Sequence, residues 1–143
     1  MSEDPDDPQN LGDGVRLLRR VPARHIERDY ETNSWKRLAD GTLRIKPQAF
    51  DDSSDGSAMT SWVATDVTIE ELLTDAGEEA DYCAIVSFTC GQARSIGQLP
   101  KRDDSDELAH VGIHGPKTKT EQKKFLTIIR VDHEPNKPPP STA

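Results

Sequence analysis

Residues 82–89 constrain the fold more than any other segment, because they form the only run in the chain that is apolar on both alternating faces. Such a run is typical of a strand that is covered on both sides. A second segment, residues 108–115, alternates apolar residues with His110, Gly112 and His114. This alternation is typical of a half-exposed strand. Together the two segments predict a covered central strand and a half-exposed neighbouring strand that displays two imidazoles.

Shorter apolar runs complete the predicted sheet. Pro22 ends the first of them, because proline cannot donate to a strand ladder. Asp40-Gly41 lies between two short runs and predicts a hairpin. Residues 91–107 contain two glycines and a charged stretch, and we expect them to form a loop along the rim of the core. The predicted strands cover residues 15–21, 35–38, 42–45, 59–64, 82–89 and 109–114.

Two helices are predicted from their N-terminal caps. Thr68 and Glu71 form a capping box, and Gly77 marks the end of that helix. Thr118 and Glu121 form a second capping box, followed by an apolar stripe that reaches residue 129, although its β-branched end also allows a strand. The order of elements predicts an α+β fold, with a single mixed or antiparallel sheet of about five to six strands and two short helices.

The composition places one folded domain between two polar ends. Hydrophobic residues make up 33% of the 143-residue chain and charged residues 31%, which is polar for a globular protein but compatible with folding. Residues 1–14 hold five acidic side chains and no basic one, whereas residues 133–143 hold four prolines. We therefore predict a disordered acidic tail at residues 1–14, a single α+β domain at residues 15–132 and a disordered Pro-rich tail at residues 133–143.

The charge is distributed in blocks. The net charge is -8, yet residues 16–46 carry nine basic side chains against four acidic ones, and residues 51–81 carry ten acidic side chains and no basic one. These blocks are either solvated faces or, for the basic block, an anion-binding surface. The overall acidity excludes generic binding of duplex DNA, because neutralising phosphates supplies most of that affinity.

The sequence predicts a cytoplasmic protein without a membrane segment. The chain has no apolar run near the roughly 18 residues that a membrane-spanning helix needs, and its acidic N-terminus does not resemble a secretory signal. Cys83 and Cys90 are seven residues apart, so on one extended segment they would point to opposite faces, which disfavours a disulfide. Two reduced thiols are typical of the cytoplasm.

His110 and His114 are the first candidates for a functional site. On a strand they share one face with Gly112, which leaves room for a ligand between the two imidazoles. They could bind a metal, bind an anion, or be ordinary partly exposed histidines. A metal site needs a third ligand, and the available residues are Asp104, Asp106 and Cys90. Because none of these completes a recognisable metal motif, we predict no metal and no cofactor.

Arg19 and Arg94 are further candidates. Arg94 is the one charged residue in the stretch from residue 82 to residue 100, so it either pairs with a carboxylate or binds an anion. The candidate carboxylate partners of Arg94 are Asp51, Asp52 and Asp66. If they converge, Arg19, Arg94, His110 and His114 would suit a phosphate or a carboxylate, and these four residues form the predicted anion site.

A set of short motifs resembles a family of small bacterial proteins of unknown function. In that family an Arg-Arg-aliphatic-Pro motif, an Ala-Phe with polar followers and a late Ala-His…Gly-x-Lys-Thr occur in this order. The resemblance covers residues 15–130 and implies a bacterial origin and a single compact domain, but no activity and no catalytic residue. It is carried by Arg19-Arg20-Val21-Pro22, residues 47–52, Met59-Thr60, Ala93-Arg94 and residues 109–118.

Two functions are predicted. The chain contains no GxSxG, GxxxxGK[ST], GxGxxG or paired CxxC motif, so no catalytic residue is assigned. The charge blocks and the polar ends favour a protein-interaction module with a protein partner. The alternative is an enzyme or sensor for a nucleotide or RNA phosphate, which would use the predicted anion site to hold a small phosphate-bearing ligand.

Overall fold

A six-stranded antiparallel sheet forms the centre of the computed structural model, which describes residues 11–53, 56–102 and 110–140. The strand order is β6-β7-β4-β1-β5-β8, and every neighbouring pair is antiparallel. The predicted α+β fold with an antiparallel sheet is therefore confirmed. The strands are β1 (Arg16–Val21), β4 (Met59–Val63), β5 (Ala84–Thr89), β6 (Leu99–Arg102), β7 (His110–His114) and β8 (Arg130–His133), with β2 (Arg28–Asp29) and β3 (Ser34–Trp35) in a second, two-stranded sheet.

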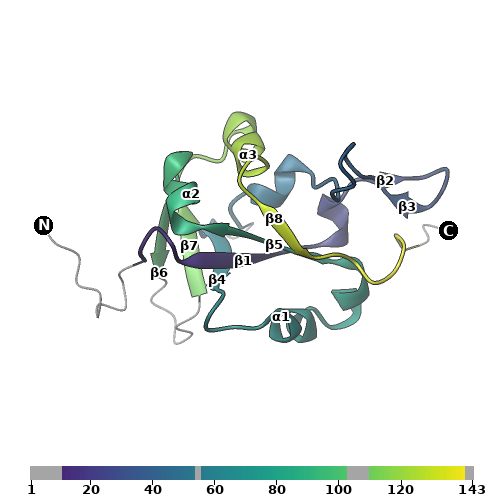
Figure 1. The fold of residues 1–143 in the computed structure, drawn as a ribbon, viewed down its shortest axis with the longest axis horizontal. Coiled ribbons are helices and arrows are strands. Elements are labelled where there is room, and N and C mark those ends of the chain that lie inside the picture. Colours follow the sequence, from purple (N-terminus) through teal and green to yellow (C-terminus); the bar gives the residue numbers. More distant parts are fainter. Residues whose placement is uncertain (1–10, 54–55, 103–109, 141–143) are drawn as a thin grey trace, which may run out of the picture.

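Helices cover the two faces of the sheet, as Figure 1 shows with α1 on one side and α2 and α3 on the other. Both predicted caps are present, because the hydroxyls of Thr68 and Thr118 accept hydrogen bonds from the backbone N–H groups of Glu71 and Glu121. Gly77 ends α1 with a positive φ of 62°. The helices are α1 (Ile69–Ala76), α2 (Cys90–Ser95) and α3 (Lys119–Phe125), with 3-10 helices η1 (Ala23–His25), η2 (Pro47–Phe50) and η3 (Gly77–Tyr82).

The prediction of a loop at residues 91–107 is wrong over its first part, where α2 and β6 lie; residues 103–109 fall outside the described chain. The helix has a local cause, because Thr89 and Gln92 form a capping box directly after β5. It also has a tertiary cause, because Cys90 and Ala93 are completely buried. A helix of six residues is too short to show a clear apolar period, so the sequence pattern conceals it.

The core lies mainly on the face of the sheet that α2, α3 and η2 cover. The rings of Phe50 and Phe125 stack there with centroids 5.2 Å apart, and Phe88 meets Phe125 edge-on at 5.7 Å. On the opposite face Leu72 of α1 packs in a smaller cluster with Leu18 and Ile85. Strand β5 contributes to both clusters and is buried over Ala84–Phe88, which confirms the predicted covered strand.

The predicted neighbourhood of the two key strands is wrong, because β4 and β1 lie between β5 and β7. Strand β7 is paired with β4 and β6, and β5 is paired with β1 and β8. The apolar pattern predicts that a strand is covered, but it does not predict which strand lies beside it. The second predicted helix is also shorter than the apolar stripe: α3 ends at Phe125, and β8 starts at Arg130.

The predicted hairpin at Asp40-Gly41 is a real chain reversal, although its arms are single bridges rather than strands. Arg37 pairs with Leu43 in an antiparallel bridge, and the N–H of Leu38 donates to the carbonyl of Thr42 at 2.8 Å.

None of the described helices combines the length and apolar character that crossing a bilayer demands.

Residues 133–140, which the sequence assigns to a disordered tail, are in contact with the domain; residues 1–10 and 141–143 lie outside the description. His133 is the last residue of β8, and the following proline-rich segment offers carbonyl acceptors to side chains of the small sheet. Lys137 also pairs with Asp81 at 3.1 Å. The donors and acceptors are Trp35 Nε1 to Lys137 O at 2.9 Å, Asn33 Nδ2 to Pro139 O at 3.1 Å and Arg28 Nη1 to Pro140 O at 3.0 Å.

Candidate functional site

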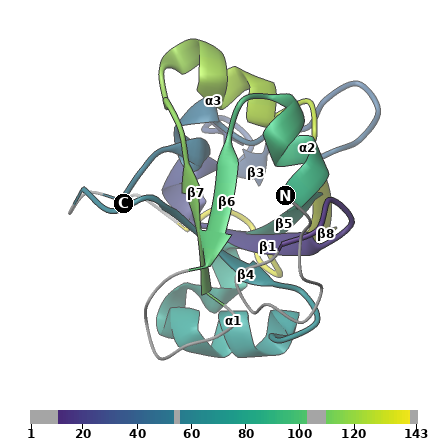
Figure 2. The same cartoon turned by 90° about the vertical axis from the view of Figure 1, so that its left-hand side faces the viewer.

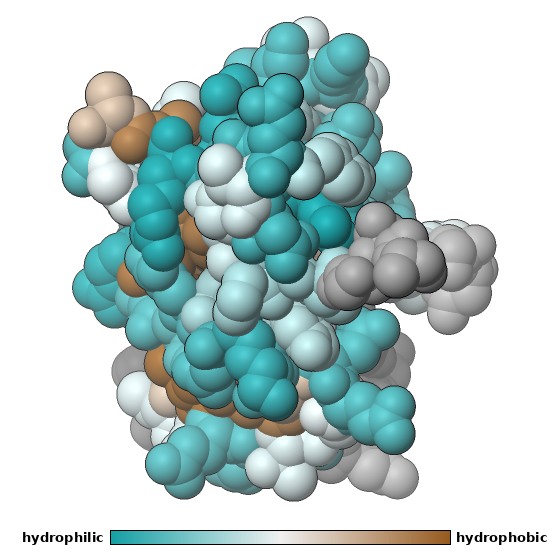
Figure 3. All heavy atoms as spheres, turned by 90° about the vertical axis from the view of Figure 1, so that its right-hand side faces the viewer, coloured by the Kyte–Doolittle hydropathy of each residue, from teal (hydrophilic) through white to brown (hydrophobic). Residues whose placement is uncertain are grey.

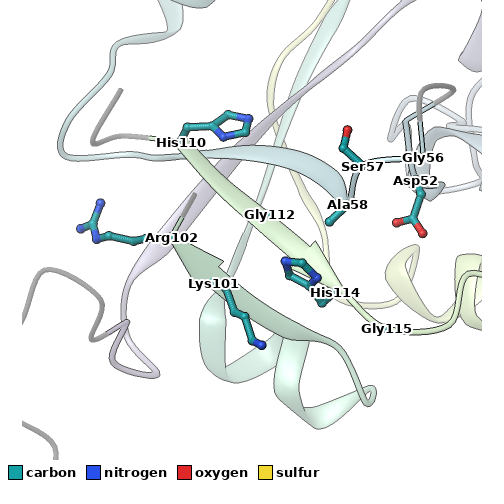
Figure 4. Close-up of a pocket in the computed structure, with 10 residues that line it drawn as sticks. All are labelled: Asp52, Gly56, Ser57, Ala58, Lys101, Arg102, His110, Gly112, His114 and Gly115. Carbon is teal, nitrogen blue, oxygen red and sulfur yellow. The ribbon is translucent and has the colours of Figure 1, made fainter. Parts of the chain in front are cut away.

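The two predicted histidines lie on one face of β7, and they line a hollow of about 630 Å³ (Figure 4). The register explains which side chains join them. Gly112 is opposite Lys101 of β6, and His110 is opposite Trp62 of β4, so all of these residues share the same face of the sheet. The half-exposed strand with two imidazoles and a glycine is thus present.

The hollow exists because helices leave this part of the sheet uncovered. Helix α1 packs against β1 and β5 through Leu72, Leu18 and Ile85. Figure 2 shows β6 and β7 toward the viewer, with α1 beyond one end of these strands and α2 and α3 beyond the other. The loop before β4 supplies the opposite wall through Asp52, Gly56, Ser57 and Ala58.

Gly112 lets the imidazole of His114 lie close to the strand. A Cβ atom on Gly112 would be 3.2 Å from His114 Nε2 and 3.3 Å from Ala58 Cβ, so a larger residue would push one of these groups away. The ring of His114 therefore folds back toward the centre of the hollow. This explains physically why a glycine lies between the two histidines.

The cationic groups of the hollow differ in their contacts. Lys101 Nζ and the imidazole of His114 have no hydrogen-bond or ion-pair partner among residues 11–53, 56–102 and 110–140. His110 meets the ring of Trp62 edge-on at 6.1 Å. Arg102 also lines the hollow, and its Nη1 lies 4.0 Å from Asp66 Oδ2. The side chains of Lys101 and His114 are therefore available to a ligand.

Among the described lining residues Asp52 is the one acidic side chain, and it is already bonded within the fold. Asp52 Oδ1 accepts hydrogen bonds from Lys117 Nζ at 3.1 Å and from the N–H of Met59 at 3.1 Å. Lys117 has a side chain that is only 3% exposed, and it also donates to the carbonyls of Ile113 at 2.9 Å and Gly115 at 3.0 Å. All three ammonium donors are thereby used, and Asp52 is neutralised. Among the described lining residues, Lys101 thus remains as a cation without an ion pair, whereas Arg102 pairs with Asp66.

Arg19 lies on the other face of β1 and does not line this hollow. The pairing of β1 with β4 stops at Leu18 and Trp62, and the guanidinium fills the space where the strands diverge. It donates to the carbonyls of Ala49 at 2.8 Å and Thr60 at 2.6 Å. Burial lowers its pKa to about 10, against the opposing effect of Asp51 and Asp52, so it stays charged at neutral pH. Arg19 joins β1, β4 and η2.

Arg94 is also used within the fold. Its Nη1 lies 2.5 Å from Asp13 Oδ1, and its Nη2 donates to the carbonyl of Leu11. Of the two predicted alternatives for Arg94, the structure shows the carboxylate partner. That partner is Asp13 and not Asp51, Asp52 or Asp66. Asp13 belongs to the segment that the sequence assigns to an acidic tail, so sequence distance concealed this pair. Of the four predicted residues, the hollow contains His110 and His114.

Sequence reasoning missed Lys101 and Arg102 as lining residues. Both lie in the segment predicted to be a loop, and the sequence Leu99-Pro100-Lys101-Arg102 shows no apolar–polar alternation that would have indicated the strand. Their role depends on register: only the pairing of β6 with β7 places Lys101 opposite Gly112.

Among the described residues, no three His, Cys, Asp or Glu side chains are grouped to hold a metal ion. Asp104 and Asp106 lie outside the described chain. Cys83 and Cys90 are buried and free, and burial raises the pKa of Cys90 to about 11, so this thiol remains protonated at neutral pH.

Comparison of the chain with protein-family models, curated proteins and solved structures gave no significant match.

Proposed function

We propose that this protein binds a small phosphate-bearing ligand in the hollow over β6 and β7. The observation that carries the proposal is that Lys101, His110 and His114 line one hollow, and that Asp52, the one carboxylate among its described lining residues, is bonded to Lys117. A nucleotide sensor and a nucleotide-processing enzyme both need this binding step, so the proposal concerns binding and assigns no reaction.

Phosphate suits the chemistry of these side chains. Lys101 offers three donors on a flexible stem, and His114 offers a ring nitrogen that lies close to the sheet. A charge-assisted hydrogen bond to a phosphate oxygen contributes about 1.5–3 kcal/mol. Two such bonds correspond to a weak but measurable affinity for a single phosphate group, and the wide hollow leaves room for the rest of the ligand.

Calorimetric titration with adenosine monophosphate tests the proposal. Lys101→Met should weaken binding about tenfold or more, because one charge-assisted hydrogen bond is lost. Lys36→Met removes the same charge from an exposed position outside the hollow and should change the affinity less than twofold. Adenosine, which lacks the phosphate, should not bind. Equal binding of adenosine and its monophosphate, or equal loss in the two variants, would contradict the proposal.

A protein-interaction module is the second candidate, supported by an apolar groove of about 470 Å³ between the hairpin after β3 and the α3–β8 segment. Leu38 at its rim is 49% exposed, and Leu126 and Ile129 line it. Figure 3, which views the end of the molecule that carries β2 and β3, shows hydrophobic residues in small areas among hydrophilic ones. Leu38→Asp should abolish a protein complex captured from cell extract, whereas Tyr30→Asp, at an exposed position outside the groove, should preserve it.

We propose a cytoplasmic location for either function. The support is chemical: two buried, unbridged thiols persist in a reducing compartment. The bacterial origin implied by the resemblance stays a prediction.

A further inference from the structure

The hollow over β6 and β7 adjoins a second one, because Asp52 lines both. The second hollow has a volume of about 470 Å³, and its basic residues are Arg19, Arg24 and His25. The same three residues line a third hollow of about 520 Å³ that reaches Trp62. The three hollows therefore follow one another along the surface, with basic residues in each.

Arg24 supplies the positive charge of a second pole in this row, and His25 lies beside it. Arg24 is exposed and makes no hydrogen bond or ion pair with any residue that the structure describes. The Nδ1 atom of His25 is buried, and no described residue bonds to it. Burial lowers the pKa of His25, and Arg24, Arg19 and Lys46 lower it further, which shows that the surroundings are positive. This pole offers donors that the fold does not use.

Carboxylates separate the two poles. Asp51 and Asp52 line the second hollow, and Asp52 forms its boundary with the first. Asp51 Oδ1 accepts a hydrogen bond from the N–H of Asp52, and Asp52 Oδ1 is bonded to Lys117. A carboxylate repels a phosphate but accepts hydrogen bonds from hydroxyl groups. A ligand that fits this order of groups carries two anionic groups joined by a unit with a hydroxyl.

We propose that the ligand is a short oligoribonucleotide. One phosphate binds at Lys101 and His114, and the next binds at Arg24 and His25. The ribose between them places its 2′-hydroxyl beside Asp51. This inference rests on the proposed function and extends it, because a single nucleotide would occupy the first pole alone. The 2′-hydroxyl is the group by which a protein distinguishes RNA from DNA at a given position.

The overall acidity of the chain is compatible with this ligand. Long nucleic acids are attracted by a broad positive field, and a net charge of -8 opposes that attraction. A ligand with two phosphates needs only two local poles. We therefore expect binding of short, single-stranded ends rather than of long duplexes.

Calorimetric titrations with three ligands test the inference on the full chain: adenosine monophosphate, the 5′-phosphorylated dinucleotide pApA and its deoxy form pdApdA. The dinucleotide pApA should bind about tenfold more tightly than the monophosphate, because it makes the second phosphate contact. Arg24→Met should remove this gain while changing the affinity for the monophosphate less than twofold. Lys36→Met is the control of matched charge, and Arg24→Gln repeats the test with a polar side chain.

The outcomes separate the inference from the proposed function. If adenosine monophosphate fails to bind the unmodified chain, the proposed function is wrong. If it binds, but pApA binds no more tightly or Arg24→Met leaves the gain intact, the second pole is wrong and the first stands. Equal affinities for pApA and pdApdA would overturn the placement of the ribose beside Asp51. Arg24 is exposed, so its variants should melt within about 2 °C of the parent chain.

Discussion

Lys117, which follows β7, and Lys101, which lies in the neighbouring strand β6, have opposite roles. Lys117 is buried and donates to Asp52 and to the carbonyls of Ile113 and Gly115. Lys101 is exposed opposite Gly112, and its ammonium has no partner among the described residues. The two side chains have the same chemistry, so their surroundings determine whether their donors stabilise the fold or remain available to a ligand.

The arginines repeat this difference. Arg19 is enclosed where β1 and β4 diverge and donates to two backbone carbonyls. Arg24, five residues later, is exposed in a hollow and makes no such bond with a described residue. Buried polar groups must be hydrogen-bonded because leaving them unpaired costs free energy. A buried cation is therefore a structural element here, whereas an exposed cation beside a hollow is a candidate for binding.

The largest expected effect is a loss of stability when the buried side chain of Lys117 is replaced. Lys117→Met should lower the free energy of unfolding by about 3 kcal/mol, because it removes the ammonium that pairs with Asp52 and donates to two carbonyls. Urea denaturation followed by circular dichroism measures this. A loss below about 1 kcal/mol would show that Lys117 does not join the loop at Asp52 to β7.

The next effect concerns the glycine between the histidines. Gly112→Ala should weaken binding of adenosine monophosphate about tenfold, because the added Cβ displaces the imidazole of His114 or Ala58. Gly12→Ala is a suitable control, since a Cβ at Gly12 meets no atom within 4 Å. Unchanged affinity in Gly112→Ala would mean that the position of the His114 ring is unimportant for the ligand.

A smaller effect is expected from pH. The pKa of His25 is lowered in the folded chain, first by burial and then by Arg24, Arg19 and Lys46, with Asp51 opposing. As the pH falls below the ordinary histidine value of about 6.5, the unfolded chain takes up the proton first, so the free energy of unfolding falls. His25→Gln should flatten this dependence between pH 7.5 and 5.5.

Urea titrations at several pH values compare the two chains. At pH 5.5 the carboxyls of Glu121 and Glu134 are ionised in the unfolded chain, because the ordinary glutamate pKa is about 4.3. They are also ionised in the folded chain, where their pKa values are lowered further. A slope that is identical in the parent chain and in His25→Gln would contradict the lowered pKa of His25.

The smallest effect is expected for the exposed lysine. Lys101→Met should change the free energy of unfolding by less than about 0.5 kcal/mol, because an exposed side chain without a partner contributes little to stability. The same variant should lose ligand affinity, which is the reverse of the behaviour expected for Lys117→Met. A destabilisation as large as that of Lys117→Met would remove the distinction between the two lysines.

Parts of this architecture could be predicted because they depend on neighbours along the chain. The capping box at Thr68 and the N-cap at Thr118, whose hydroxyl accepts from the Glu121 N–H without the reciprocal bond, are local hydrogen-bond patterns within four residues. The alternation of His110, Gly112 and His114 predicts a shared strand face, because side chains on a strand alternate between faces. The buried run that became β5 is equally local.

Other parts depend on pairings that no local pattern encodes. The partner of Arg94 is Asp13, which is 81 residues away in sequence, and Lys101 faces Gly112 only because β6 pairs with β7. The same register separates Arg19 from the two histidines, and it places β4 and β1 between β5 and β7.

The amino-acid sequence by itself therefore determined the class of fold, the covered strand and the face that carries the imidazoles, since each follows from the period of one segment. Only the tertiary structure decided which cations are enclosed and which border the hollow. The reason is physical: enclosure depends on which strands and loops meet, and these contacts join residues whose order along the chain does not reveal their distance in space.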